Sequence, residues 1–302
     1  MSSALALQST LAVDAPALIA LLCALVACGT LGNFLVLRKE AMTGDAVAHA
    51  VLPGLVAGFL ITGTRSITAM FVGAACAGIA SILLANWARR TTRLEPGATL
   101  GIVFTGLFAV GVLLLETQGA RQVDLDPECV LFGSLETLFY SPTLNGAWYT
   151  GVPRALWTLA AAACIALIAI VLFMKELSLL AFDPSSARHL GVAPRWLERL
   201  FLALVSASIV ASFEAVGSVL VIGIVACPAL IAAPHARSVT HQITLSMILG
   251  SIIAVLGYAL ASHAPTLFGT ATALNSAGMI ALVLAIAVPM SHVAKRFIHR
   301  PM

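Results

Sequence analysis

Long apolar runs without a single Asp, Glu, Lys or Arg constrain the fold of this chain more than any other feature of its sequence. Each is near the length of about 20 residues that a helix needs to cross a hydrocarbon layer roughly 30 Å thick. Eight such runs occur, at 15–37, 46–64, 66–88, 97–115, 155–174, 215–234, 243–262 and 271–291. Only 10% of the residues are charged, against about 25% in a soluble domain. We therefore predict that residues 1–302 form one all-α, polytopic transmembrane bundle.

A ninth apolar segment, 200–213, is short for a full crossing and is either a half-helix inside the bundle or a further span. If it crosses, the Lys and Arg residues separate by side. One side collects Arg38, Lys39, Arg89, Arg90, Arg93, Lys175, Arg188, Arg195, Arg199, Arg237, Lys295, Arg296 and Arg300. The other side has Arg65, Arg121 and Arg154. By the positive-inside rule we expect nine spans in the cell membrane, with the N-terminus outside and the C-terminus in the cytoplasm.

Several classes of protein are disfavoured by the rest of the composition. The net charge of +3 is scattered, without the basic and aromatic interleaving that binds nucleic acid. The six cysteines are dispersed and form no CxxC pair, which argues against a disulfide framework or a zinc knuckle. The sequence contains no GxxxxGK[ST], GxSxG or HExxH motif. We expect a lipid-embedded protein that is not an enzyme, does not hydrolyse ATP itself and holds no permanently bound cofactor.

The segment 43–54, TGDAVAHAVLPG, carries the strongest candidate site, Asp45 and His49. Residues four apart lie on one face of a helix, so the carboxylate and the imidazole can share a divalent transition metal. Ionisable groups within a membrane helix are costly and by default indicate a pathway or a site. The alternative is an Asp that caps the helix and a His bonded to a neighbouring helix. The spacing alone leaves both interpretations open.

Glu214, in SFEAVGSVLV, is a weaker metal-ligand candidate, because an acid at the water boundary of a span explains it as well. The largest predicted cytoplasmic excursion is 175–199. Its Asp183 and Pro184 can cap and open a helix, so we expect two short amphipathic helices around a turn.

Four segments in this order resemble the permeases of ATP-binding-cassette importers for manganese, zinc and iron: 43–54, 101–115, 181–191 and 215–232. The segment 123–136, VDLDPECVLFGSLE, looks most like the manganese branch. The resemblance implies a type II importer permease fold of eight or nine spans, working as a homodimer or a pair of permeases. It also implies a cytoplasmic ATPase subunit on each half and an external solute-binding protein. The cargo would be a divalent ion, manganese ahead of zinc or iron.

The resemblance extends to individual residues. Asp45 and His49 match the Asp and His of the family's second membrane helix. The pattern FDxxxAxxxG matches the loop that docks on the ATPase, which assigns coupling roles to Phe182, Asp183, Ala187 and Gly191. In the turn just before the fourth span, where the family often carries an acidic residue, this chain has Glu95–Gly97. Leu230 and Pro234 are departures, because smaller or helix-compatible residues are usual there. Two rival functions are a permease for a metal chelate such as a siderophore or corrinoid, and a secondary transporter driven by an ion gradient.

Overall fold

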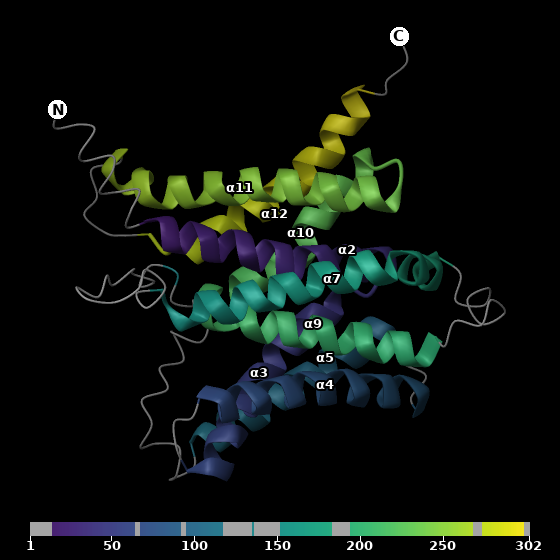
Figure 1. Cartoon of the computed structure of the whole chain (residues 1–302), viewed down its shortest axis with the longest axis vertical. Helices are drawn as coiled ribbons and strands as arrows, with labels where there is room; N and C mark the ends of the chain where they lie inside the picture. The colour runs from purple at the N-terminus through teal and green to yellow at the C-terminus, as the bar shows by residue number, and fades with distance from the viewer. Residues whose placement is uncertain are drawn as a thin grey trace.

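The structure, a computed structural model, describes residues 14–63, 67–91, 95–116, 135, 152–182, 194–267 and 274–298. The described residues are arranged in helices, with no strand among them (Figure 1). The first span, Asp14–Leu37, contains a π-helical turn, η1 (Leu25–Gly29), followed by α2 (Thr30–Leu37). The other helices are α3 (Met42–Thr62), α4 (Ile67–Thr91), α5 (Pro96–Leu115), α7 (Arg154–Phe182), α9 (Pro194–Val216), α10 (Ser218–Ala232), the 3₁₀ turn η4 (Ala233–His235), α11 (Val239–Leu267) and α12 (Ser276–Ile298).

Within the described ranges, 9 segments are long and apolar enough to cross a membrane, which confirms the predicted all-α, multi-span fold. The uncertain segment 200–213 belongs to a full-length one, Trp196–Val216. The apolar run underestimates this helix because α9 begins at Pro194 and contains Glu198 and Arg199 before the run starts. A helix end that reaches the polar interface tolerates such charges.

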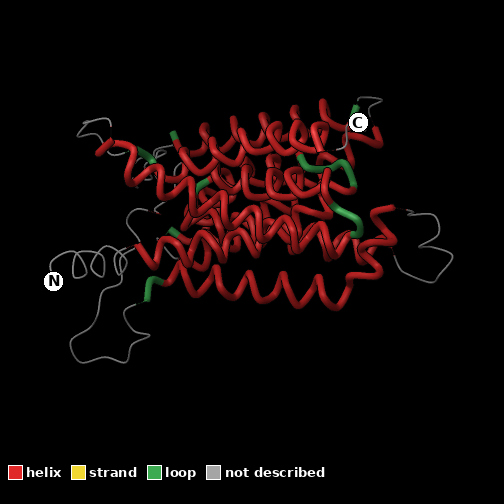
Figure 2. The backbone as a smooth tube through the Cα atoms, turned by 90° about the horizontal axis from the view of Figure 1, so that it is seen from above, coloured by secondary structure: helices red, strands yellow, loops and turns green. Residues whose placement is uncertain are grey.

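The helices lie roughly side by side, and most described loops are found towards the two ends of the bundle (Figure 2). In Figure 1, α11 lies at one edge and α4 at the other, with α7 and α9 between them. One end of the row is built by α3, which packs on α4 and α5, and the other by α10, which packs on α11 and α12. These two parts are joined by direct contact of α3 with α10 and by α9, which packs on α3 and α4 and also contacts α10.

The junction between α9 and α10 depends on one glycine. Gly217 has φ 80° and ψ 164°, a region that is open almost only to glycine. Its amide donates to the Phe213 carbonyl at 3.0 Å, and its carbonyl accepts from the Val221 amide at 3.1 Å. The chain therefore changes direction within a single residue. The predicted span 215–234 is wrong at its start, because Ala215 and Val216 complete α9.

The predicted cytoplasmic excursion 175–199 is in part the ends of two long helices. Residues up to Phe182 continue α7 beyond Phe173, whose φ and ψ of −106° and 20° mark a kink. Leu177 and Leu180 are buried after this kink, as expected for an amphipathic segment. Phe182 is 67% exposed at the end of the helix. Asp183, Ala187 and Gly191 lie outside the described residues, as do the turn and most of the second predicted helix.

Candidate metal-binding site

The start of α3 places the candidate ligands. Asp45 lies in the first turn of this helix, where the partial positive charge of the helix N-terminus favours a carboxylate. The N-cap residue of α3 is Ala41, whose side chain cannot accept a hydrogen bond. Asp45 therefore does not cap the helix, which was the alternative explanation for an Asp at this position. Gly44, the residue before Asp45, lies so close to Val225 of α10 that an added Cβ would approach the Val225 side chain to 2.9 Å. The first turn of α3 is therefore packed closely against α10.

Asp45 and His49 face each other along α3. The distance from His49 Nε2 to Asp45 Oδ1 is 3.3 Å, and the two side chains are 31% and 29% exposed respectively. A half-exposed carboxylate and imidazole at this spacing offer one oxygen and one nitrogen to the same point. This donor set suits manganese, iron or zinc better than magnesium or calcium.

Two aromatic rings of α5 hold the imidazole. The His49 ring stacks on Phe104, with 5.0 Å between ring centroids and 16° between planes. Phe108, one helical turn further, meets the same imidazole edge-on at 5.6 Å and 81°. Within the described parts of the chain, the ring contacts of His49 are with these two phenylalanines, and its polar side-chain contact is with Asp45. The alternative explanation for His49, a hydrogen bond to a neighbouring helix, is therefore not supported by the described residues.

Pro53 adds a further polar atom to this region. It lies inside α3, four residues after His49, and proline has no N–H. The helical hydrogen bond to the His49 carbonyl oxygen is therefore missing. Gly111 of α5 packs directly on the proline ring, so closely that an added Cβ would lie 2.8 Å from Pro53 Cδ. The His49 carbonyl oxygen therefore lacks its helical partner in the turn that follows the Asp45–His49 pair.

Glu214 lies far from this pair. It is exposed near the C-terminal end of α9. Val47, which lies between Asp45 and His49 in α3, packs against Gly78 of α4, and so does Ser206, in the middle of α9. Glu214 is eight residues further along α9 than Ser206, about 12 Å at 1.5 Å per residue. Among the described residues, no group of three or more His, Cys, Asp or Glu side chains is arranged to hold a metal. The metal-ligand roles of Asp45, His49 and Glu214 stay predictions, and a metal ion at Asp45 and His49 would need further ligands from elsewhere.

Sequence reasoning missed Phe104, Phe108 and Pro53 as parts of the site. Pro53 could have been found, because a proline four residues after a candidate ligand always removes that residue's helical hydrogen bond. The spacing of Phe104 and Phe108 places them on one helix face, but spacing does not reveal which helix that face meets.

The described part of the chain forms a helical bundle with nine membrane-length segments and an acid–imidazole pair inside one of them. These features define a polytopic membrane protein with a candidate site for a metal ion. The match to known families agrees with this class. Residues 12–294 match the model of the ABC 3 transport family, so the chain belongs to that family.

Individual relatives carry metal-transport names. The chain is 36% identical over 233 residues to the manganese transport system membrane protein MntD of Bacillus subtilis, covering 77% of this chain and 78% of that protein. It is 34% identical over 236 residues to the zinc transport system membrane protein TroD of Treponema pallidum, covering 78% of this chain and 64% of that protein. Among solved structures, PsaBC from Streptococcus pneumoniae in complex with Fab has a TM-score of 0.71 at 23% identity, covering 91% of this chain and 89% of that one. At this identity, the structural match supports the fold alone.

Proposed function

We propose that this chain is the membrane-spanning permease subunit of an ATP-binding-cassette importer that carries a divalent transition-metal ion into the cytoplasm. Manganese is the first candidate cargo, ahead of zinc and iron. The observation that carries the proposal is the Asp45–His49 pair, held at 3.3 Å on α3 in a chain of the ABC 3 transport family. The manganese and zinc names of the relatives support the choice of cargo class.

The chain would act with partners. ATP hydrolysis belongs to a separate cytoplasmic ATPase subunit, and an external solute-binding protein would deliver the ion. The permease would work as a homodimer or as a pair of different permeases. The second permease would also supply further metal ligands, because the described residues of one chain offer only Asp45 and His49 at this site. The distribution of Lys and Arg supports a cell-membrane orientation with the N-terminus outside and the C-terminus in the cytoplasm.

In the proposed cycle, Phe182, Asp183, Ala187 and Gly191 contact the ATPase, and its closure moves the two permease halves between outward-open and inward-open states. Asp45 and His49 hold the ion in passage and break no covalent bond. The imidazole contributes a nitrogen ligand of borderline softness, and the carboxylate offsets part of the charge of the ion in a region of low dielectric constant.

The test is uptake by proteoliposomes that contain the chain, its ATPase and its solute-binding protein. We expect ATP-dependent accumulation of free Mn²⁺, with Zn²⁺ and Fe²⁺ as competitors. Uptake of an intact siderophore or corrinoid without free-ion uptake would contradict the proposal. Metal uptake that continues without ATP and stops when a proton or sodium ionophore is added would instead identify a secondary transporter.

A further inference from the structure

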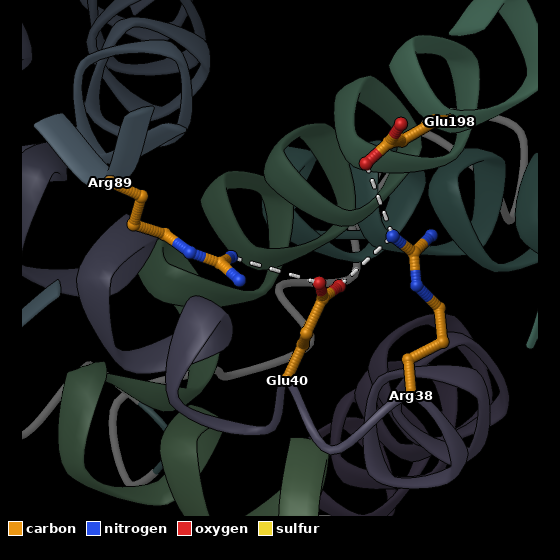
Figure 3. Close-up of polar contacts among 4 residues, drawn as sticks. All are labelled: Arg38, Glu40, Arg89 and Glu198. Atoms are coloured by element: carbon orange, nitrogen blue, oxygen red, sulfur yellow. Dashed lines mark hydrogen bonds and ion pairs between the residues drawn. The ribbon is translucent and has the colours of Figure 1, made fainter. Parts of the chain in front are cut away.

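A second charged cluster lies close to the same end of α3. It comprises Arg38, Glu40, Arg89 and Glu198, drawn together in Figure 3. Arg38 follows α2, Glu40 lies in the short turn before α3, Arg89 is near the end of α4 and Glu198 is near the start of α9. Three segments that are distant in sequence, the turn between α2 and α3, the end of α4 and the start of α9, therefore meet through ion pairs.

Arg38 is the centre of the cluster. Its Nη2 donates to Glu198 Oε1 at 3.2 Å and pairs with Glu40 Oε2 at 3.0 Å. The guanidinium also lies over the Phe201 ring of α9, 5.7 Å from the centroid. The Arg38 side chain is only 12% exposed, whereas that of Glu198 is 39% exposed. A charge this buried depends on its partners, because each lost partner leaves it uncompensated away from water.

The pair with Arg89 is the weaker part of the cluster. Arg89 Nη1 lies 3.9 Å from Glu40 Oε1, and both side chains are partly exposed, at 34% and 26%. An ion pair of this length and exposure contributes little to stability. Arg89 therefore serves as a control for the two tighter contacts of Arg38.

The turn that contains Glu40 is tightly held. The amides of Lys39 and Glu40 donate to the carbonyls of Val36 and Leu35 at 3.0 and 2.8 Å. The Thr43 amide donates to the Glu40 carbonyl at 2.9 Å, which joins this turn to the first turn of α3. A displacement of Glu40 therefore passes directly into the helical turn that carries Asp45.

We propose that Arg38 is a positioning residue of the transport cycle, whose guanidinium couples the start of α9 to the turn before α3 and so sets the position of Asp45 and His49. This inference rests on the proposed function, because Glu198 lies within the segment 175–199 that is expected to receive the force of the ATPase. Movement of α9 pulls on Glu198, and Arg38 transmits that movement to Glu40. The cluster gives the ATPase a short path to the metal site through two ion pairs.

The test is the number of metal ions transported per ATP hydrolysed by the complete complex in proteoliposomes. Glu198→Gln keeps the shape of the side chain and removes its charge, and Arg89→Gln is the matched control. We expect Glu198→Gln to lower the ratio by at least about fivefold, the lower end of common couplings between sites, while ATP hydrolysis continues. The double variant Arg38→Glu with Glu198→Arg should lower it less than Arg38→Glu alone.

A purely structural role predicts something else. ATP hydrolysis and uptake would then fall in parallel with the amount of folded complex, and the ratio would not change, which would overturn the proposal. An unchanged ratio in a well-folded Glu198→Gln complex would overturn it as well.

If the wild-type complex transports no metal, the proposed function fails. The coupling role of Arg38 is then tested separately by the distance between α3 and α9. Genetically encoded spin labels at the exposed positions Met42 and Trp196 report the separation of α3 from α9. We expect Glu198→Gln to broaden or shift this distance distribution, and Arg89→Gln to leave it unchanged. Identical distributions in wild type and Glu198→Gln would refute the coupling.

Discussion

The crossing of α3 and α4 provides a direct test of how the site helix is held. Gly54 of α3 lies against Gly73 and Ala74 of α4, and an added Cβ would lie 2.5 Å from the Gly73 carbonyl oxygen and 2.6 Å from Ala74 Cα. These atoms are backbone and cannot rotate away. Because ordinary contact begins at 3.4 Å, Gly54→Ala requires the two helices to separate by about 0.9 Å.

The size of the effect follows from two opposing terms. Replacing glycine by alanine within a helix favours the helix by about 1 kcal/mol. Forcing an extra carbon into a packed contact costs about 1–3 kcal/mol. Gly106→Ala on α5 is the matched control, because its added Cβ has no neighbour within 4 Å. The helix term is common to both variants, so their difference isolates the collision, about 1–3 kcal/mol less stable for Gly54→Ala.

The assay is reversible unfolding of the purified chain in mixed detergent micelles, followed by circular dichroism. We expect Gly106→Ala to be as stable as wild type or more stable, and Gly54→Ala to be less stable than Gly106→Ala by the amount given above. Equal stability of the two variants would refute the close crossing. It would also mean that the contact with α4 does not fix the position of α3, the helix that carries Asp45 and His49.

Three further outcomes are expected. Gly217→Ala places a side chain at φ 80°, and we expect it to lower the free energy of unfolding in the same assay by about 1–3 kcal/mol. The control Gly223→Ala, whose added Cβ would have its nearest non-local atoms at 3.8 Å, should not lower this free energy. Phe104→Ala removes a stacking contact of His49 worth about 0.5–1.5 kcal/mol. We expect this variant to bind Mn²⁺ up to roughly tenfold more weakly, measured by electron paramagnetic resonance. The control variant Thr105→Ala, which changes an exposed neighbouring residue, should bind Mn²⁺ as the wild type does. Asn33 Nδ2 donates to Ser246 Oγ at 2.7 Å between α2 and α11, so a double-mutant cycle with alanine at both positions should give a coupling of about 0.6 kcal/mol; a coupling of zero would remove this bond from the packing.

The spans were predictable because membrane crossing leaves a signal in composition alone. The first predicted run, 15–37, agrees closely with Asp14–Leu37, since apolar bulk and helix length are set by the same hydrocarbon layer. Helix ends were less predictable. The kink at Phe173 has no proline or glycine of its own to announce it, and α9 extends through charged residues that interrupt the apolar signal.

The site was predictable only as far as one helix. Spacing along the chain places Asp45 next to His49, and the structure has this pair at 3.3 Å. The contact of His49 with Phe104, and the ion pair of Arg38 with Glu198 across 160 positions of sequence, depend on how helices pack. Side chains of this kind carry no periodic signal, because a single Arg or Phe also occurs on helix faces that meet only solvent or lipid.

The most direct test of the metal site is ATP-dependent Mn²⁺ uptake by Asp45→Asn and His49→Gln, which keep side-chain size and remove a ligand atom or its basicity. His263→Gln, an exposed histidine near the end of α11 that bonds to the Ala259 carbonyl of its own helix, is the matched control. We predict that both site variants lose most Mn²⁺ uptake in fully assembled complexes, while His263→Gln transports as wild type. Wild-type uptake by Asp45→Asn and His49→Gln would contradict the assignment of this pair as the metal site.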